Sequence, residues 1–166
     1  MCTVLRIRSR RTPSCVLHCA LALVVCVGLA GCDSPSSPSP VNGLRLLINV
    51  SPTTIPAGMN GTVTATLRNV GDTTRTVTLA TGCASLIRLF KYPGSEPVPL
   101  NVICVLVAVP VTLEPDQEYT QTHLVGSGSS TLPQTLLQPG EYYAVAAFEE
   151  PDAPDLRSNS VRFTVQ

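Results

Sequence analysis

The sequence predicts an all-β fold, an antiparallel sandwich, and three observations lead to that prediction. Short segments with alternating apolar and polar residues recur at intervals of roughly 8 to 14 residues. No long helical period of apolar residues is present in the body of the chain. Fifteen prolines and eleven glycines, with many valines and threonines, favour short strands joined by turns.

The alternation is clearest in two segments, 43–51 (GLRLLINVS) and 61–69 (GTVTATLRN), which we expect to be the first strands. Their inner faces would carry Leu44, Leu46, Ile48 and Val50 in the first strand, and Val63, Ala65 and Leu67 in the second. Residues 69–74 (NVGDTT) predict a turn, because Asn, Gly and Asp tolerate the backbone of a tight reversal.

Six further strands are expected after this turn. They cover residues 75–80, 84–94, 101–111, 117–125, 141–148 and 158–165, the last with Val161, Phe163 and Val165 inward. The segment 101–111 (NVICVLVAVPV) is a continuous apolar run. It is either a central strand covered on both faces, or an exposed strand that offers a surface to a partner. Residues 43–166 are thus predicted to form an immunoglobulin-like β-sandwich of about seven to nine strands.

Residues 1–31 have the features of a bacterial export signal. Four arginines precede residue 15, and the apolar stretch 16–30 is shorter than the ~20 residues of a membrane-spanning helix. The stretch ends in LAGC, Leu29 to Cys32, which resembles the lipobox of bacterial lipoproteins. This resemblance implies cleavage before Cys32, a diacylglycerol group on its thiol and an acylated amino terminus. An uncleaved N-terminal anchor helix is the alternative.

Residues 32–42 are predicted to be a lipid-anchored linker. Its Ser and Pro residues cannot form a core and keep the chain extended or flexible. Two or three acyl chains hold a protein firmly at a membrane. We therefore expect an extracytoplasmic protein of the bacterial cell envelope, anchored to a membrane through Cys32, with the leaflet left open. From Cys32 onward seven basic residues face eleven acidic ones, a net charge of −4, which argues against a nucleic-acid partner.

Of the seven cysteines, four precede residue 31 and Cys32 is the predicted anchor, which leaves Cys83 and Cys104. In an exported domain such a pair usually forms a disulfide, and closing this loop would stabilise the fold by roughly 3 kcal/mol. Two separate buried thiols are the alternative. Neither cysteine shows metal-ligand spacing with the other or with His123.

No catalytic, metal or cofactor site is predicted. His123 is the one candidate base, and its place in segment 117–125 favours a surface strand residue. Residues 126–130 (GSGSS) precede no helix whose amides could hold a phosphate, so a flexible loop is expected. Four carboxylates favour a solvated acidic loop over a Ca²⁺ site: Glu149, Glu150, Asp152 and Asp155.

Several motifs together resemble the domain family named for the bacterial intracellular proteinase inhibitor (BsuPI). They are VTATLRNVGDTTRTVTL, LIRLFKY, TLEPDQEYTQT and LQPGEYYAVAAF. The resemblance implies an immunoglobulin-like fold, with Tyr143 similar to the tyrosine corner of Greek-key sandwiches. The sequence thus predicts a non-enzymatic envelope module that binds an unknown extracytoplasmic protein or has a structural role. Proteinase inhibition is the alternative function.

Overall fold

The computed structural model describes residues 38–80, 83–103, 107–148 and 156–166, which contain eleven strands and no helix. The predicted signal peptide, Cys32, the linker before residue 38, Cys104 and the acidic loop 149–155 lie outside these residues. In the described part, no helix is long and apolar enough to span a membrane.

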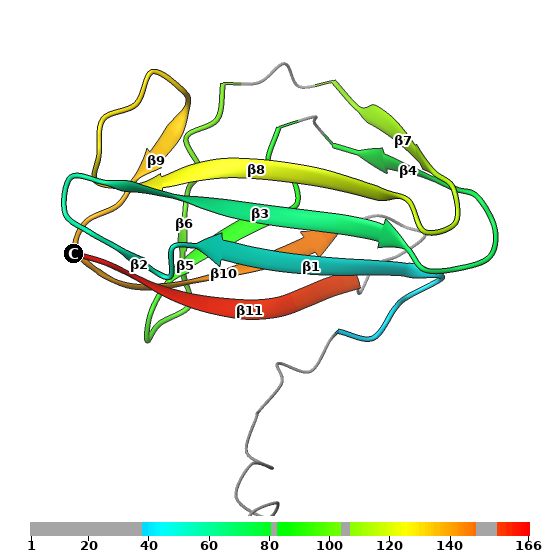
Figure 1. Ribbon diagram of the computed structural model, residues 1–166, viewed down its shortest axis with the longest axis horizontal. Helices are drawn as coiled ribbons and strands as arrows, with labels where there is room; N and C mark the ends of the chain where they lie inside the picture. The colour runs from blue at the N-terminus through cyan, green and yellow to red at the C-terminus, as the bar shows by residue number, and fades with distance from the viewer. Residues whose placement is uncertain (1–37, 81–82, 104–106, 149–155) are drawn as a thin grey trace, which may run out of the picture. The chain divides into compact units, whose positions relative to one another are not determined.

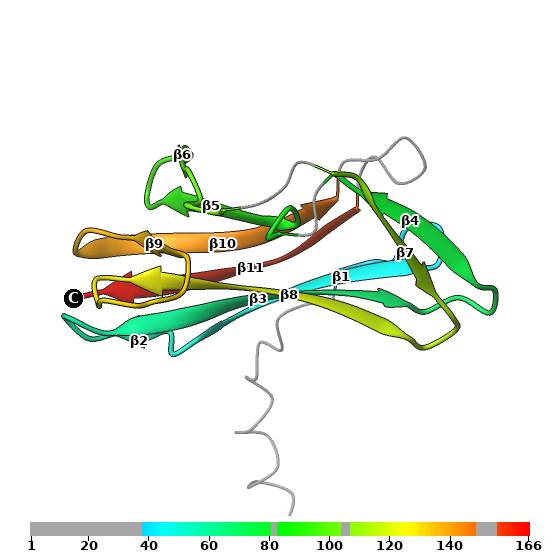
Figure 2. The same cartoon turned by 90° about the horizontal axis from the view of Figure 1, so that it is seen from above.

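Two main sheets form the body of the domain (Figure 1). The first contains, in spatial order, β1 (Leu44–Ser51), β3 (Asn60–Asn69), β8 (Glu118–Gly126) and β9 (Gln134–Leu136). The second contains β2 (Thr54–Ile55), β11 (Leu156–Val165), β10 (Gly140–Phe148), β5 (Ile87–Lys91) and β6 (Glu96–Val98). A separate two-stranded sheet consists of β4 (Arg75–Leu79) and β7 (Val109–Leu113). Figure 2 shows the two main sheets as two layers.

This arrangement is an immunoglobulin-like sandwich. Strands β1, β3 and β8 take the places of strands A, B and E, while β5, β10 and β11 take those of C, F and G. The all-β sandwich prediction is confirmed, with eleven strands in the described residues where seven to nine were expected. Most pairs are antiparallel, but β2 pairs with β11 and β9 with β8 in parallel. The unexpected strands β2, β6 and β9 have only two or three residues each, too short for a period to mark them.

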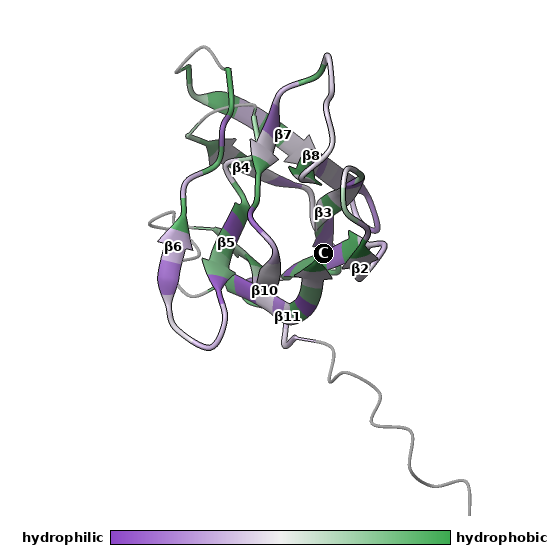
Figure 3. Ribbon diagram, turned by 90° about the vertical axis from the view of Figure 1, so that its left-hand side faces the viewer, coloured by the Kyte–Doolittle hydropathy of each residue, from purple (hydrophilic) through white to green (hydrophobic). Residues whose placement is uncertain are grey.

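The core lies between the two layers, and strands β1 and β3 show why it forms there. Their residues alternate between buried and partly exposed positions, and the antiparallel register places Leu46 opposite Leu67 and Ile48 opposite Ala65. Figure 3 shows apolar and polar residues alternating along the strands. The other layer contributes Ile87, Leu89, Ala144, Phe163 and Val165 to the core, while Val161 is partly buried against it. Each fully buried side chain of this size contributes about 1.5–3 kcal/mol to folding.

At the outer edge of β1, the main-chain groups of Ile48 are hydrogen-bonded to a side chain of the other sheet. Asn159 of β11 accepts a hydrogen bond from the Ile48 N–H through Oδ1, and its Nδ2 donates to the Ile48 carbonyl, both at 3.1 Å. The side-chain amide thus pairs with Ile48 as a neighbouring strand would. Asn159 lies beside a register shift between Val145 and Ala147, where Ser158 Oγ accepts the Ala146 N–H at 2.7 Å.

The tyrosine corner is Tyr142, so the prediction of Tyr143 is wrong by one residue. The buried Tyr142 donates its hydroxyl to the Gln138 carbonyl at 2.8 Å, and its ring stacks on Phe163. Tyr143 lies on the opposite face of β10 and stacks on Phe90 at 5.0 Å between ring centroids. Successive strand residues point to opposite faces, so only one of two adjacent tyrosines can enter the core.

The apolar run 101–111 is not a central strand in its described residues. Its last part enters β7, which pairs only with β4 among the strands described and exposes every second residue. Val102, Ile103 and Val107 are exposed. The second alternative, an exposed apolar segment, is therefore the one that the described residues adopt.

Candidate functional site

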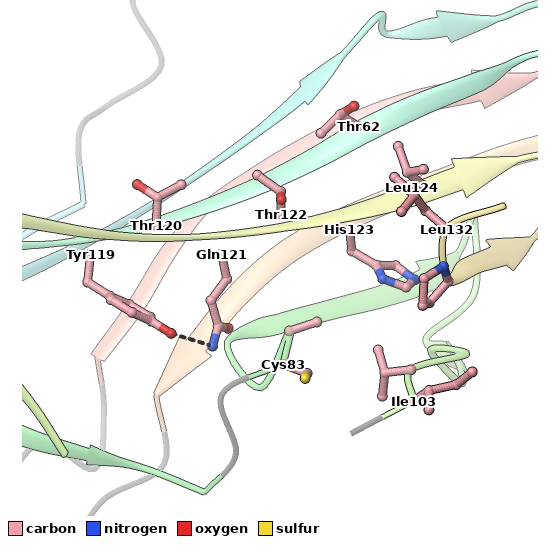
Figure 4. A pocket seen from close by; sticks show the side chains of 13 residues that line it. Thr62, Cys83, Ile103, Tyr119, Thr120, Gln121, Thr122, His123, Leu124 and Leu132 are labelled. Atoms are coloured by element: carbon pink, nitrogen blue, oxygen red, sulfur yellow. Dashed lines mark hydrogen bonds between the residues drawn. The ribbon is translucent and has the colours of Figure 1, made fainter. Parts of the chain in front are cut away.

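A cavity of about 570 Å³ lies beside β8. Strand β8 forms one wall with residues 119–124, and Cys83 and Ala84, which precede β5, also line the cavity. Val102 and Ile103 contribute from the segment after β6, and Leu132 and Pro133 from the turn before β9. Figure 4 shows these side chains around the cavity. Its volume falls within the range of ligand pockets, roughly 300–1,000 Å³.

Successive side chains of β8 point to opposite faces of the strand. Tyr119, Gln121 and His123 point toward the side of Cys83 and Ile103, whereas Thr120 and Thr122 point the opposite way (Figure 4). Gln121 and His123 are both buried. The prediction of His123 as a surface residue is therefore wrong, because its position in the strand places it on the inner face.

Gln121 connects β8 to the segment that precedes β5. Its Oε1 accepts the Leu86 N–H at 3.0 Å, and its Nε2 donates to Ser85 Oγ at 3.3 Å and to the Tyr119 hydroxyl at 3.4 Å. These bonds satisfy a buried amide, which would otherwise destabilise the fold. Gln121 therefore holds one wall of the cavity against the other.

His123 is within hydrogen-bond distance of Thr135, a buried threonine of β9. Its Nε2 lies 2.8 Å from Thr135 Oγ1, which also accepts the Asn101 N–H at 2.9 Å. Burial lowers the pKa of His123 below its usual value of 6.5, so the imidazole is neutral at pH 7. Among the described residues that line the cavity, none is an Asp, Glu, Lys or Arg. These residues thus form an uncharged lining, and none of them is a carboxylate that could orient the imidazole.

The rim of the cavity is apolar and open to solvent. Ile103 is 82% exposed, Leu132 64% and Val102 37%. These three residues come from two segments that are separated in sequence by almost thirty positions. We call them the apolar rim. They surround a floor of buried polar side chains that already have hydrogen-bond partners.

The glycine-rich segment 126–130 has a packing role that differs from the expected flexibility. A Cβ atom on Gly126 would lie 2.5 Å from the Met59 carbonyl oxygen, and one on Gly128 would lie 2.7 Å from the Gly58 carbonyl oxygen. Only glycine permits this close approach of two backbones. A strand, β9, follows the segment rather than a helix.

Cys32 and Cys104 lie outside the described residues, so lipidation and the disulfide stay predictions; Cys83 lines the cavity. In the part of the chain that the structure describes, no three His, Cys, Asp or Glu side chains are grouped so that they could hold a metal ion. Sequence reasoning missed Gln121, Thr135 and the rim residue Leu132, because segments distant in sequence meet here.

Comparisons with known proteins give only distant similarities. No family model matches the chain, and no curated protein sequence matches it. Among solved structures, the chain is similar to a β-glucosidase from Erythrobacter marinus, with 16% identity and a TM-score of 0.44 over 74% of this chain. A β-glucosidase from Listeria innocua in complex with gluconolactone gives 15% and 0.42 over 78%. The chain spans only 15% and 16% of the lengths of these two enzymes.

A smaller protein is similar over most of its own length. The CARDB domain of a Pyrococcus furiosus protein shows 18% identity and a TM-score of 0.41, with 78% of this chain and 93% of that domain covered. All three TM-scores lie below 0.5, so these likenesses support no inference about the present chain.

Proposed function

We propose that this protein is a non-enzymatic, lipid-anchored module of the bacterial cell envelope that binds an extracytoplasmic protein. The observation that carries the binding part is the cavity beside β8, with its exposed apolar rim of Val102, Ile103 and Leu132. Exposed apolar residues that gather around a concave site are typical of interaction surfaces. A binding role needs no chemistry from the cavity, only a complementary partner.

The non-enzymatic part rests on the surroundings of His123. A general base needs a nucleophile or substrate proton within reach and usually a third group that orients it. His123 Nε2 lies within hydrogen-bond distance of Thr135 Oγ1, which already accepts the Asn101 N–H, and both His123 and Thr135 are buried. These bonds support a structural role for the imidazole.

The anchoring part rests on the lipobox-like LAGC and the Ser/Pro-rich linker that follows it. The test is incorporation of an alkyne-labelled fatty acid into the exported full chain. Label should enter the wild-type protein and C26A, which changes a cysteine of the predicted signal peptide, and should be lost in C32A. Equal labelling of C32A, or an unlabelled wild-type protein, would contradict the proposal.

The binding part is tested with a photo-crosslinking amino acid placed on the apolar rim in living cells. A crosslinker at Ile103 should give one discrete adduct with an extracytoplasmic protein. The same crosslinker at Asp72, an exposed residue of the turn between β3 and β4, is the matched control and should give none. Identical adduct patterns at both positions, or no adduct at Ile103, would argue against a partner at this cavity.

A second candidate, proteinase inhibition of the BsuPI type, is favoured by one specific observation. Residues 99–103 have no regular secondary structure, and this segment is held to β9 by Asn101, whose N–H and Nδ2 donate to Thr135 Oγ1 and the Gln134 carbonyl. A supported segment with the exposed Ile103 beside it is a shape that a protease cleft can accept. Stoichiometric loss of activity in a panel of proteases, relieved by I103D, would favour this candidate over the first.

A further inference from the structure

Among the described strands, one edge of β8 has no neighbour over most of its length. Along its inner edge β8 pairs with β3 from Glu118 to Gly126. Along its outer edge it pairs with β9 only from Leu124 to Gly126. In the described parts of the chain, no strand lies against the outer edge between Glu118 and His123. This stretch is about 20 Å long, given a rise of about 3.4 Å per residue.

The hydrogen-bond pattern shows which main-chain groups point to this open edge. Asn69 N–H donates to the Gln117 carbonyl on the side of β3, and Leu137 N–H donates to the Gly126 carbonyl on the side of β9. Main-chain groups of successive strand residues point to opposite edges, so odd-numbered residues of β8 face β3 and even-numbered ones face outward. The N–H and C=O groups of Thr120 and Thr122 therefore point to the open edge.

The cavity lies along the same edge. Its lining includes β8 residues 119–124, so the outward main-chain groups of Thr120 and Thr122 border it directly. On its other side lie Cys83 and the rim residue Ile103 (Figure 4). An edge with free donors and acceptors beside an apolar groove is the arrangement that accepts an extended peptide by strand addition.

We propose that the outer edge of β8 binds an extended segment of another protein as an additional strand, with apolar side chains alternating with small polar ones. This inference deepens the proposed binding function and depends on it. The described residues that line the cavity are all uncharged types, Thr, Cys, Ala, Val, Ile, Tyr, Gln, Leu and Pro beside His123, which makes an uncharged segment the complementary occupant. The neutral His123 adds no charge. Strand β9 already pairs with this edge, so the added strand continues an existing sheet.

The alternation follows from the two sides of β8. A strand beside Thr120–His123 would project every second side chain to the side of Tyr119, Gln121 and His123, into the cavity and toward the apolar rim. Its other side chains would lie beside Thr120 and Thr122, which are exposed, and small polar or β-branched residues fit there. Cavity pockets for alternate side chains would supply specificity, and main-chain bonds would supply affinity.

The probe is a capped peptide of about seven residues in which valine and threonine alternate, added to the full chain in detergent micelles. We expect saturable binding, with slower amide hydrogen exchange at Thr120 and Thr122. A peptide with the same side chains but methylated main-chain amides should bind at least about tenfold more weakly, the effect of losing one hydrogen bond or more. Equal binding of both peptides, or no binding of either, would overturn the proposal.

Two variants at one position separate main chain from side chain. T122P removes the outward N–H without removing a bond to β3, and proline is tolerated at such edge positions. T122V keeps every main-chain group. We expect T122P to bind the probe at least about tenfold more weakly than T122V, which controls for the loss of the threonine side chain. Should T122P fail to fold, as judged by circular dichroism, the methylated peptide on wild-type protein still decides.

The outcomes also separate this proposal from the function on which it rests. A crosslinked partner at Ile103 together with no binding of the unmethylated probe would leave the binding module standing and overturn strand addition. Protection of Thr120 and Thr122 that grows with protein concentration in the absence of probe would identify a second copy of this chain as the occupant. That result would overturn the proposed partner class.

Discussion

The side-chain amide of Asn159 makes both main-chain hydrogen bonds of Ile48, one as acceptor and one as donor, each at 3.1 Å. The two residues are 111 positions apart and belong to different sheets. One side chain thus joins the layers of the sandwich at an edge where no other described strand of the first sheet lies beside β1.

Replacement of Asn159 should destabilise the domain. In N159A the N–H and C=O of the buried Ile48 lose their partners, and we expect the free energy of unfolding to fall by about 1–3 kcal/mol. Urea denaturation of the purified protein measures this change. N49A, at an exposed position of β1 next to Ile48, is the control and should change the free energy of unfolding by less than about 0.5 kcal/mol. A loss in N49A as large as in N159A would contradict the account.

The two adjacent tyrosines of β10 should respond differently to loss of the hydroxyl. Y142F removes the hydrogen bond to the Gln138 carbonyl, and we expect a loss of about 0.5–1.5 kcal/mol. In Y143F the ring and its stacking on Phe90 are kept, so the free energy of unfolding should change little. Thermal unfolding of both variants side by side tests the assignment. A larger effect in Y143F would restore Tyr143 as the corner residue.

Stability should depend on pH through His123. Its pKa is lowered in the folded state, so below about pH 6.5 the unfolded chain binds a proton that the folded chain excludes. The stabilising effect of the neutral imidazole is therefore complete above pH 6.5 and declines as the pH falls toward the folded-state pKa. The slope can reach about 1.4 kcal/mol per pH unit.

The variant H123Q isolates this effect. Glutamine can hydrogen-bond to Thr135 but does not titrate. The free energy of unfolding of the wild type minus that of H123Q should therefore decrease as the pH falls from 7.5 to 5.5. Denaturation at several pH values measures that difference. The contributions of the carboxylates cancel in it, because both proteins contain the same carboxylates. A difference independent of pH would show that His123 is not the titrating group.

The predicted disulfide gives a fourth test. Cys83 lines the same cavity as Ile103, the residue before Cys104, which is consistent with pairing. Nonreducing peptide mapping of the exported protein should find the two cysteines in one linked peptide. Reduction should lower the free energy of unfolding by about 3 kcal/mol in wild type and leave the C83S/C104S double variant unaffected. Recovery of two free thiols would refute the bridge.

The regular part of the fold could be predicted from the sequence because one face of each long strand is apolar. In β1 and β3 the alternation defines both the strand and its inner face, and the register with Leu46 opposite Leu67 follows from burying that face. The apolar run 101–111, which extends into β7, has no such alternation. When both faces of a segment are apolar, its sequence predicts neither which strand it pairs with nor which of its faces is buried.

The candidate site was less predictable because polar or apolar residues occupy both faces of the strands that form it. The same ambiguity explains the error at the tyrosine corner of β10, outside this site, where the inward Tyr142 and Ala144 alternate with Tyr143 and Val145. In β8 the inward His123 alternates with threonines. The signal is present only in the register, which places His123 opposite the buried Val63, and sequence alone does not supply the register.

The bonds between Asn159 and Ile48 have a consequence for assembly beyond the single domain. Endless filaments built by edge-to-edge pairing require two open edges on every copy, one to receive and one to present. At Ile48 the edge of β1 is occupied by the Asn159 side chain, so a second copy that paired with this edge would first have to displace that side chain. The two hydrogen bonds therefore disfavour edge-to-edge growth through β1.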